Sequence, residues 1–464
     1  MNWLPVIGVG LWVLGLAVLM SGLGRRAWRS SVSASPRQEF PNNNRFWRFL
    51  FWSELPAVAL AVLAGMIWTP VLWAAPLVGL AYALLHMAVE KRLSHPTVAD
   101  LAIFLFCVVL AVNYSLAVIP ENTLNPALRI LGGIALFYAV AHWSQHELDL
   151  RWLGVLTGFV TLGLCLFSLI AVNWTSGKLF FIPLSVYERF AVFVSDAIHP
   201  NVLAGSLIAL MPLLLAMPLF AWKELGWGER ILFGVGLIIA MAGLLLTQSR
   251  SALLALSAVL MIVFILRSSW FWIAPLAVLL VGLGLTVHFG QEEFVLRFTD
   301  LISIEGLGQR ADIWTRAIYM IQDFPLTGVG LGHFSDAFRI FYPMSLDPTS
   351  HMPHAHNFFL QVGADLGIPG LVLWLSILLS SLGAAWAVYR RGKKTDQALV
   401  RAFGAGLLGC QLAIILHGLF DSVLWGEIRI APLVWWIWGM AMAGLNVVGQ
   451  PENSRGTGEL LIRD

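Results

Sequence analysis

Hydrophobic and polar positions along this chain are arranged in long blocks rather than in the short periods of a soluble domain. Apolar stretches long enough to cross roughly 30 Å of hydrocarbon as a helix occur near residues 2–23, 52–69, 71–88, 98–117, 126–143, 152–173, 202–222, 231–247, 251–267, 269–287, 367–389, 400–420 and 431–448. The second and third are short enough to be one hairpin. The pattern predicts an all-α protein, a polytopic transmembrane helical bundle of about 12–13 spans.

One long polar stretch, residues 288–366, interrupts this pattern and predicts a partly helical loop. Within 308–323 the apolar residues Ile313, Ala317 and Met320 recur at steps of four and three, which predicts an amphipathic helix. We expect this helix to lie along the outer surface of the membrane. A proline and three glycines at 325–332 then predict a turn-rich crossing.

Composition narrows the class of protein. Of the 464 residues, 59% are hydrophobic and 12% are charged, which excludes an ordinary soluble domain. The net charge of +2, with no outward basic run, argues against a nucleic-acid partner. The sequence has no Walker motif, so ATP-driven transport would need a partner ATPase. The three cysteines, Cys107, Cys165 and Cys410, all fall in predicted spans and predict no disulfide framework.

Positive charges predict how the chain is oriented. Arg25, Arg26 and Arg29 directly follow the first apolar stretch, so we expect that stretch to remain as an anchor with its N-terminus outside. When alternate loops are then assigned to the cytoplasm, they hold 19 of the 28 Lys and Arg residues, as the positive-inside rule requires. The loop 288–366 is therefore predicted to be extracytoplasmic, and the polar tail after residue 448 cytoplasmic.

Three histidines in the long loop, His351, His354 and His356, are the leading candidates for chemistry. A neutral imidazole can accept or donate a proton near pH 7. Imidazoles at this spacing could also converge on a metal ion, but Asp347 is the one carboxylate nearby and no HExxH or DxD motif accompanies them. We therefore favour a single acid/base histidine with supporting neighbours over a metal site, with surface histidines of no catalytic role as the remaining alternative.

Four outward arginines are candidates to bind an anion. Arg250 lies in a turn so short that its charge must sit at or below the membrane surface, which is typical of residues that line a cavity; a snorkelling side chain is the alternative. Arg310 has no acidic partner three or four residues before it and lies in the first turn of the predicted helix, where a cation opposes the helix dipole. Arg316 follows Asp312 by four residues, so an intrahelical ion pair is its default role.

The fourth arginine, Arg189, lies between Tyr187 and Phe190 in the outward stretch 174–200 and could contact a lipid headgroup or a phosphate. In the same region Asn201 stands at the start of an apolar stretch. Its most economical role is a helix N-cap.

These residues together resemble a known family. His356-Asn357, followed after nine residues by Gly367-Ile-Pro-Gly370, resembles the HN-x9-GxxG signature of the O-antigen ligase and polymerase superfamily. Arg310 with Trp314, the run 325–334 and Ser249-Arg250-Ser251 are similar to other parts of that family's common region. The resemblance covers roughly residues 195–390. It suggests a division into N-terminal spans (1–195), a ligase-like region (196–390) and C-terminal spans with a tail (391–464).

The resemblance implies a metal-independent inverting glycosyltransferase without a cofactor, in the bacterial inner membrane with its active site on the periplasmic side. The donor would be a glycan on undecaprenyl diphosphate, and the acceptor a sugar hydroxyl on lipid A core or another glycan, with membrane lipids around the site. An O-antigen ligase is favoured over an O-antigen or exopolysaccharide polymerase or a protein oligosaccharyltransferase. A small-anion transporter is the alternative from another class.

In this interpretation His356 is the general base, with His354 in support. Arg250 and Arg310 are the leading residues to hold the diphosphate, and Arg189 and Arg316 are further candidates, because the planar guanidinium binds phosphate oxygens in pairs.

Overall fold

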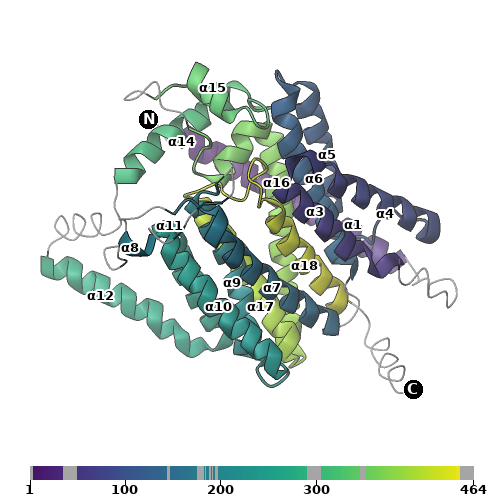
Figure 1. Cartoon of the computed structure of the whole chain (residues 1–464), viewed down its shortest axis with the longest axis vertical. Helices are drawn as coiled ribbons and strands as arrows, with labels where there is room; N and C mark the ends of the chain where they lie inside the picture. The colour runs from purple at the N-terminus through teal and green to yellow at the C-terminus, as the bar shows by residue number, and fades with distance from the viewer. Residues whose placement is uncertain are drawn as a thin grey trace.

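The computed structural model describes residues 4–34, 50–143, 147–174, 182, 184–187, 190, 192–193, 197–289, 305–344 and 352–449, and within them it is an all-α bundle (Figure 1). The long helices are α1 (Leu4–Ala34), α3 (Glu54–Ile67), α4 (Ala74–Glu90), α5 (Asp100–Ser115), α6 (Pro120–Trp143), α7 (Glu147–Ala171), α9 (Pro200–Ala221), α10 (Trp227–Thr247), α11 (Arg250–Arg267), α12 (Ile273–Phe289), α14 (Glu305–Asp323), α16 (Phe358–Lys394), α17 (Ala398–Gly418) and α18 (Pro432–Val448). Short helices are α8 (Leu184–Tyr187), α15 (Phe334–Phe341) and two 3-10 turns, Thr69–Val71 and Ser269–Trp272.

Each predicted apolar stretch corresponds to one of these helices, so the polytopic all-α fold is confirmed. Within the described residues, nine helices are long and apolar enough to cross a membrane, and α5 and α18 are shorter apolar helices. The second and third stretches form two separate helices, α3 and α4, joined by the turn Thr69–Val71.

The centre of the bundle is formed by α9 and α17, with α16, α6 and α18 around them. In α9, 83% of the residues in an 18-residue apolar stretch are buried, compared with 17% in the peripheral segment Thr69–Glu90. A helix satisfies its backbone hydrogen bonds internally. One whose side chains are apolar on all sides can therefore lie at the centre of such a bundle.

The loops that join the long helices gather at two opposite ends of the bundle. We call one the loop end, which holds α14, α15 and the loops 352–357 and 419–431. There Asn113 at the end of α5 donates to the Thr327 carbonyl (2.9 Å), and Thr123 at the start of α6 donates to the Leu331 carbonyl (2.9 Å).

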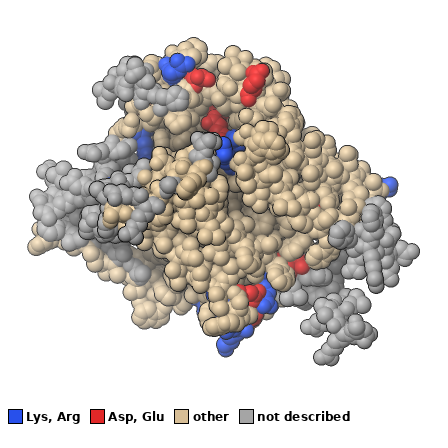
Figure 2. Space-filling view, in the orientation of Figure 1, with Lys and Arg blue, Asp and Glu red and all other residues tan. Residues whose placement is uncertain are grey.

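We call the other end the basic end, which holds the loops 91–99, 222–226, 268–272 and 395–397. Arg401 donates there to the Leu266 carbonyl (2.9 Å), and Arg267 to the Leu219 carbonyl (3.0 Å). On the face shown in Figure 2, most charged residues gather toward the top and bottom, and the region between them is largely uncharged.

The predicted amphipathic helix is present as α14, and its stripe of Ile313, Ala317 and Met320 is buried. The stripe forms a small second core with Phe334 and Phe338 of α15, above the start of α16. Packing within the protein therefore accounts for the apolar pattern that was expected to face the membrane surface.

The helix α16 begins earlier than predicted. Asn357 caps it, because the side-chain oxygen accepts the backbone N–H groups of Phe359 (3.1 Å) and Leu360 (3.0 Å). Gly367 then interrupts the helix with φ 68° and ψ −173°. A Cβ at this position would lie 2.7 Å from the Leu326 carbonyl carbon, so glycine is required where the turn after α14 packs on α16. The apolar stretch predicted from 367 therefore begins at this kink, and the helical residues 358–366 before it belong to the stretch predicted as a partly helical loop.

Candidate active site

Two segments far apart in the sequence meet at the loop end, just before α16 and just after α17. Gly418, the last residue of α17, packs so closely on Phe358 that an added Cβ would lie 3.2 Å from the Phe358 Cβ. The Asn357 side chain donates to the Leu419 carbonyl (3.0 Å). The loop that carries His354 and His356 is thereby held against the loop that begins at residue 419.

Asp421 lies at the centre of this junction, with a side chain only 1% exposed. The side-chain amide of Asn201 donates to it at 2.9 Å, and the backbone N–H of Ser422 donates to it at 2.9 Å. Burial acts to raise the pKa of Asp421, but the interaction with His356 and the neighbouring imidazoles more than offset it and hold the pKa below its ordinary value. Asp421 is therefore a buried carboxylate that stays ionised at neutral pH.

His354 is held as a neutral imidazole. Its Nδ1 accepts the backbone N–H of His356 (3.2 Å), so its proton lies on Nε2. Burial lowers the pKa of His354 to about 4, and the positive charge of Arg310 acts in the same direction, while Asp421 opposes the shift. The two imidazole rings are in contact, with centroids 4.2 Å apart.

His356 faces the carboxylate of Asp421. Its Nδ1 lies 3.5 Å from Asp421 Oδ1, and the Trp314 indole donates to its backbone carbonyl (3.3 Å). The backbone of His356 is left-handed (φ 47°), a conformation that costs energy for a residue with a side chain and tends to occur at functional sites. With Nδ1 directed at a carboxylate, the proton is favoured on Nδ1, and Nε2 is left as the basic nitrogen.

The structure places the predicted arginines as follows. Arg310 is half-buried and close enough to His354 to lower its pKa. Because α14 begins at Glu305, Arg310 is not in the first turn, and the helix-dipole argument for it is wrong. The predicted ion pair of Arg316 with Asp312 is confirmed, with Nε 3.3 Å from Oδ1.

Arg250 begins α11, directly after the predicted tight turn, and is half-buried at the loop end. The turn is stabilised by Gln248, whose backbone is left-handed (φ 53°) and whose side chain donates to the Tyr187 hydroxyl (2.6 Å). Arg189 and His351 lie outside the described residues, as does the tail after 449.

Sequence reasoning missed three residues of this site. Asn201 is not the N-cap of α9: His199 occupies that position and accepts the Asn201 backbone N–H, while the Asn201 side chain binds Asp421. His417 is buried beside Asp421 in the last turn of α17. The available signal for Asp421 was an acidic residue in a short outward loop between two apolar stretches.

The ligating atoms of His354, His356 and Asp421 lie within 4.8 Å of one another, a geometry that a metal ion could also use. Asp347, the one carboxylate expected near the histidines, lies outside the described residues, and the structure adds Asp421. However, His354 Nδ1 already accepts a backbone hydrogen bond and is not available as a ligand. The donor set therefore suits proton transfer better than metal binding.

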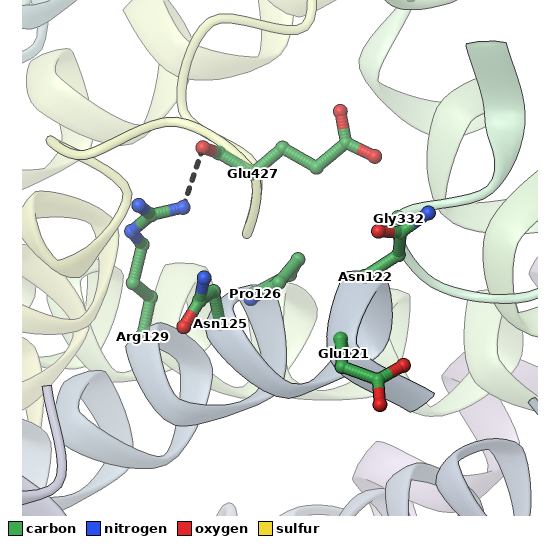
Figure 3. A pocket seen from close by; sticks show the side chains of 7 residues that line it. All are labelled: Glu121, Asn122, Asn125, Pro126, Arg129, Gly332 and Glu427. Carbon is green, nitrogen blue, oxygen red and sulfur yellow. Dashed lines mark hydrogen bonds between the residues drawn. The ribbon is translucent and has the colours of Figure 1, made fainter. Parts of the chain in front are cut away.

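A cavity opens at the loop end, beside the start of α6 (Figure 3). It encloses about 360 Å³ and is lined by Glu121, Asn122, Asn125, Pro126, Arg129, Gly332 and Glu427. Arg129 donates to the Glu427 carbonyl (2.7 Å), and burial raises the pKa of the Glu427 carboxyl to about 7. Glu427 is on the same loop as Asp421, so the cavity and the histidine site share one segment of chain.

Fold and site together define a polytopic α-helical membrane protein with a histidine–aspartate site at one end of the bundle. Residues 235–375 match the family model described as O-Antigen ligase. The chain is also similar to an O-antigen ligase from Pseudomonas aeruginosa strain PAO1, with 26% identity over 359 residues that cover 72% of this chain and 78% of that protein. Both similarities support the O-antigen ligase superfamily, which the motifs predicted, and the homology suggests a glycosyltransferase-type enzyme.

Proposed function

We propose that this protein is an O-antigen ligase that transfers a glycan from undecaprenyl diphosphate to a sugar hydroxyl of lipid A core. The observation that carries the proposal is the His356–Asp421 pair, a proton acceptor backed by a buried carboxylate, with the cation of Arg310 nearby. A site for glycosyl transfer with a diphosphate leaving group needs a base for the acceptor hydroxyl and fixed cations for the leaving group.

In the proposed reaction the acceptor hydroxyl gives its proton to His356 Nε2 as its oxygen attacks the anomeric carbon of the donor sugar. The bond from that carbon to the diphosphate oxygen breaks with inversion, and undecaprenyl diphosphate leaves with the electron pair. Asp421 stabilises the imidazolium that forms on His356. His354 stays neutral and holds the backbone of His356 in place.

The charges of the protein support the proposed orientation. Lys91, Arg230, Arg267 and Lys394 lie in or beside the loops of the basic end, so the positive-inside rule assigns this end to the cytoplasm. The histidine site at the opposite end then faces the periplasm, where lipid-linked glycans would reach it from the outer leaflet.

We predict that Arg310→Lys and Arg250→Lys lower the rate of transfer by roughly 10- to 100-fold, the cost of one charge-assisted hydrogen bond in the transition state. Lysine keeps the charge but loses the planar fork that binds two phosphate oxygens. Transfer is measured with purified variants, and Arg339→Lys on the exposed face of α15 is the control. Near-normal rates for both variants would leave the diphosphate without its proposed partners.

We also predict that transfer continues when EDTA is added to the loop-end side of sealed proteoliposomes. EDTA does not cross a bilayer, so this arrangement removes divalent ions from the histidine site alone. Arginine can neutralise a diphosphate leaving group without a metal ion. Loss of transfer that Mg²⁺, Mn²⁺ or Zn²⁺ restores would instead assign the cluster of His354, His356 and Asp421 to metal binding.

Deletion of the gene distinguishes the proposed ligase from its relatives. A lost ligase leaves long glycan chains on the undecaprenyl carrier and none on lipid A core. Single repeat units capping the core would indicate a polymerase, and unchanged surface glycan would contradict both assignments.

A further inference from the structure

A second group of ionisable side chains lies at the basic end, at the opposite end of the bundle from the histidine site. It comprises Glu54 at the start of α3, His86 and Glu90 in the last turns of α4, His95 in the loop after α4, and His142 at the end of α6. Glu54 is 6% exposed and His86 3% exposed. The proposed glycan transfer uses none of these residues.

The hydrogen bonds in this cluster determine where the protons lie. The backbone N–H of His95 donates to His142 Nε2 (3.2 Å), so the proton of a neutral His142 is on Nδ1, from which it donates to Glu54 (3.2 Å). Glu54 is a pure acceptor when ionised, so His86 Nε2, 3.1 Å from its other oxygen, must also donate. The remaining nitrogen of His86 is therefore a lone pair when the ring is neutral.

That nitrogen, His86 Nδ1, points at another acceptor. It lies 3.3 Å from Glu90 Oε2, and His95 Nε2 lies 3.4 Å from the same oxygen. Zinc bound to nitrogen and oxygen at about 2.0–2.1 Å in a tetrahedral site separates its ligands by about 3.3 Å. His86 Nδ1 and His95 Nε2 thus each lie from Glu90 Oε2 at the spacing of adjacent corners around one zinc ion, and one ion could join both pairs, whereas a single proton could bridge just one of them.

We propose that His86 Nδ1, Glu90 and His95 Nε2 form a binding site for a divalent transition-metal ion, with zinc as the best fit. Two imidazoles and one carboxylate are a ligand set that zinc accepts with a water in the fourth position. Glu54 holds His86 through its Nε2–H, and His142 holds Glu54, which is the support that metal-binding histidines usually receive. His142 is not a ligand, because its Nδ1 carries a proton and its Nε2 accepts a hydrogen bond.

Charge and position support a structural role for the metal. Glu54 and Glu90 carry two carboxylates against the one cation of Arg92 beside Glu90, so the cluster keeps net negative charge when its imidazoles are neutral. The side chain of His95 is 37% exposed, which gives an ion access from the cytoplasmic side. The hairpin of α3 and α4 is peripheral and has few buried residues, and the metal would fix its end to the loop before α5 and, through Glu54 and His142, to α6.

The test uses the full-length protein purified in detergent, stripped of metal and then equilibrated with Zn²⁺. We expect one zinc per chain by mass spectrometry in the wild type and in His356→Ala, and none in His86→Ala or His95→Ala. Glu54→Gln should weaken zinc binding by about 10- to 100-fold. Co²⁺ should give visible absorption bands in the wild type that His95→Ala lacks.

His95→Ala changes a partly exposed loop residue, so it keeps the proposal testable where His86→Ala fails to fold. Zinc should also raise the melting temperature of the wild type but not that of His95→Ala.

Two results would overturn the proposal. The first is a wild type that binds no zinc and whose melting temperature responds to pH alone, which would show that His86 is held between Glu54 and Glu90 as an imidazolium. Zinc lost in His356→Ala and retained in His95→Ala would move the metal to the other end of the bundle. Either result overturns the proposal, and neither depends on whether the protein transfers glycan.

Discussion

The variant His356→Ala should lose glycan transfer by about 10² to 10⁴, the usual cost of removing a general base. The protein should remain folded, because this imidazole lies in a loop, is 25% exposed and adds little to the core. Transfer is measured with purified variants that elute as a single species, and His288→Ala at the exposed end of α12 is the matched control.

Wild-type activity in His356→Ala would end the assignment of this residue as the base. Activity lost in His354→Ala and kept in His356→Ala would move the role to the neighbouring imidazole. We expect a smaller effect for His354→Ala, because His354 acts on the position of His356 rather than on the acceptor.

Replacing Asp421 with asparagine should impair transfer almost as strongly, again by about 10² to 10⁴, as in other histidine–aspartate catalytic pairs. The new side chain has the same shape, and its one oxygen can keep the hydrogen bond from Asn201, which the carboxylate accepts on Oδ2, while the amide N–H₂ replaces Oδ1 and loses the hydrogen bond from the Ser422 N–H. Its amide N–H₂ would then face His356 Nδ1 and favour the proton on Nε2, which removes the basic nitrogen from the acceptor. The carboxylate that stabilises the imidazolium is lost as well.

The control for Asp421→Asn is Asp336→Asn, which removes a half-exposed carboxylate from α15. Because Asp421 is buried, the melting temperature of both variants must be measured beside their activity. A stable Asp421→Asn protein with normal transfer would show that the carboxylate holds the two loops together and takes no part in the reaction.

The fold could be predicted from sequence because a continuous apolar stretch as long as a membrane span is stable in the membrane as an α-helix. The stripe of Ile313, Ala317 and Met320 likewise identified α14. The start of α16 could not be predicted, since residues 358–366 are stabilised by the cap at Asn357 and by packing under α14 rather than by contact with lipid. Such contacts leave no hydrophobic pattern that distinguishes a helix from a loop.

Part of the candidate active site could be predicted from the sequence. His356 and Asn357 belong to a local motif whose spacing is visible in one sequence, and Arg316 with Asp312 follows the rule for helical ion pairs. Asp421 and Asn201 lie outside the matched residues 235–375. Asn201 reaches Asp421, and Asp421 reaches His356, only because α17 ends where α9 begins in the fold. The same holds for Glu54, His86 and His142, which stand on three different helices and meet only through helix packing.

Reconstitution is the direct test of glycan transfer at the site of His356 and Asp421. Purified protein in proteoliposomes is given a labelled glycan on undecaprenyl diphosphate together with lipid A core. We predict that label appears on the acceptor in step with released undecaprenyl diphosphate, and that His356→Ala abolishes both. Movement of a small anion across the bilayer without any transfer of label would contradict it and favour a transporter.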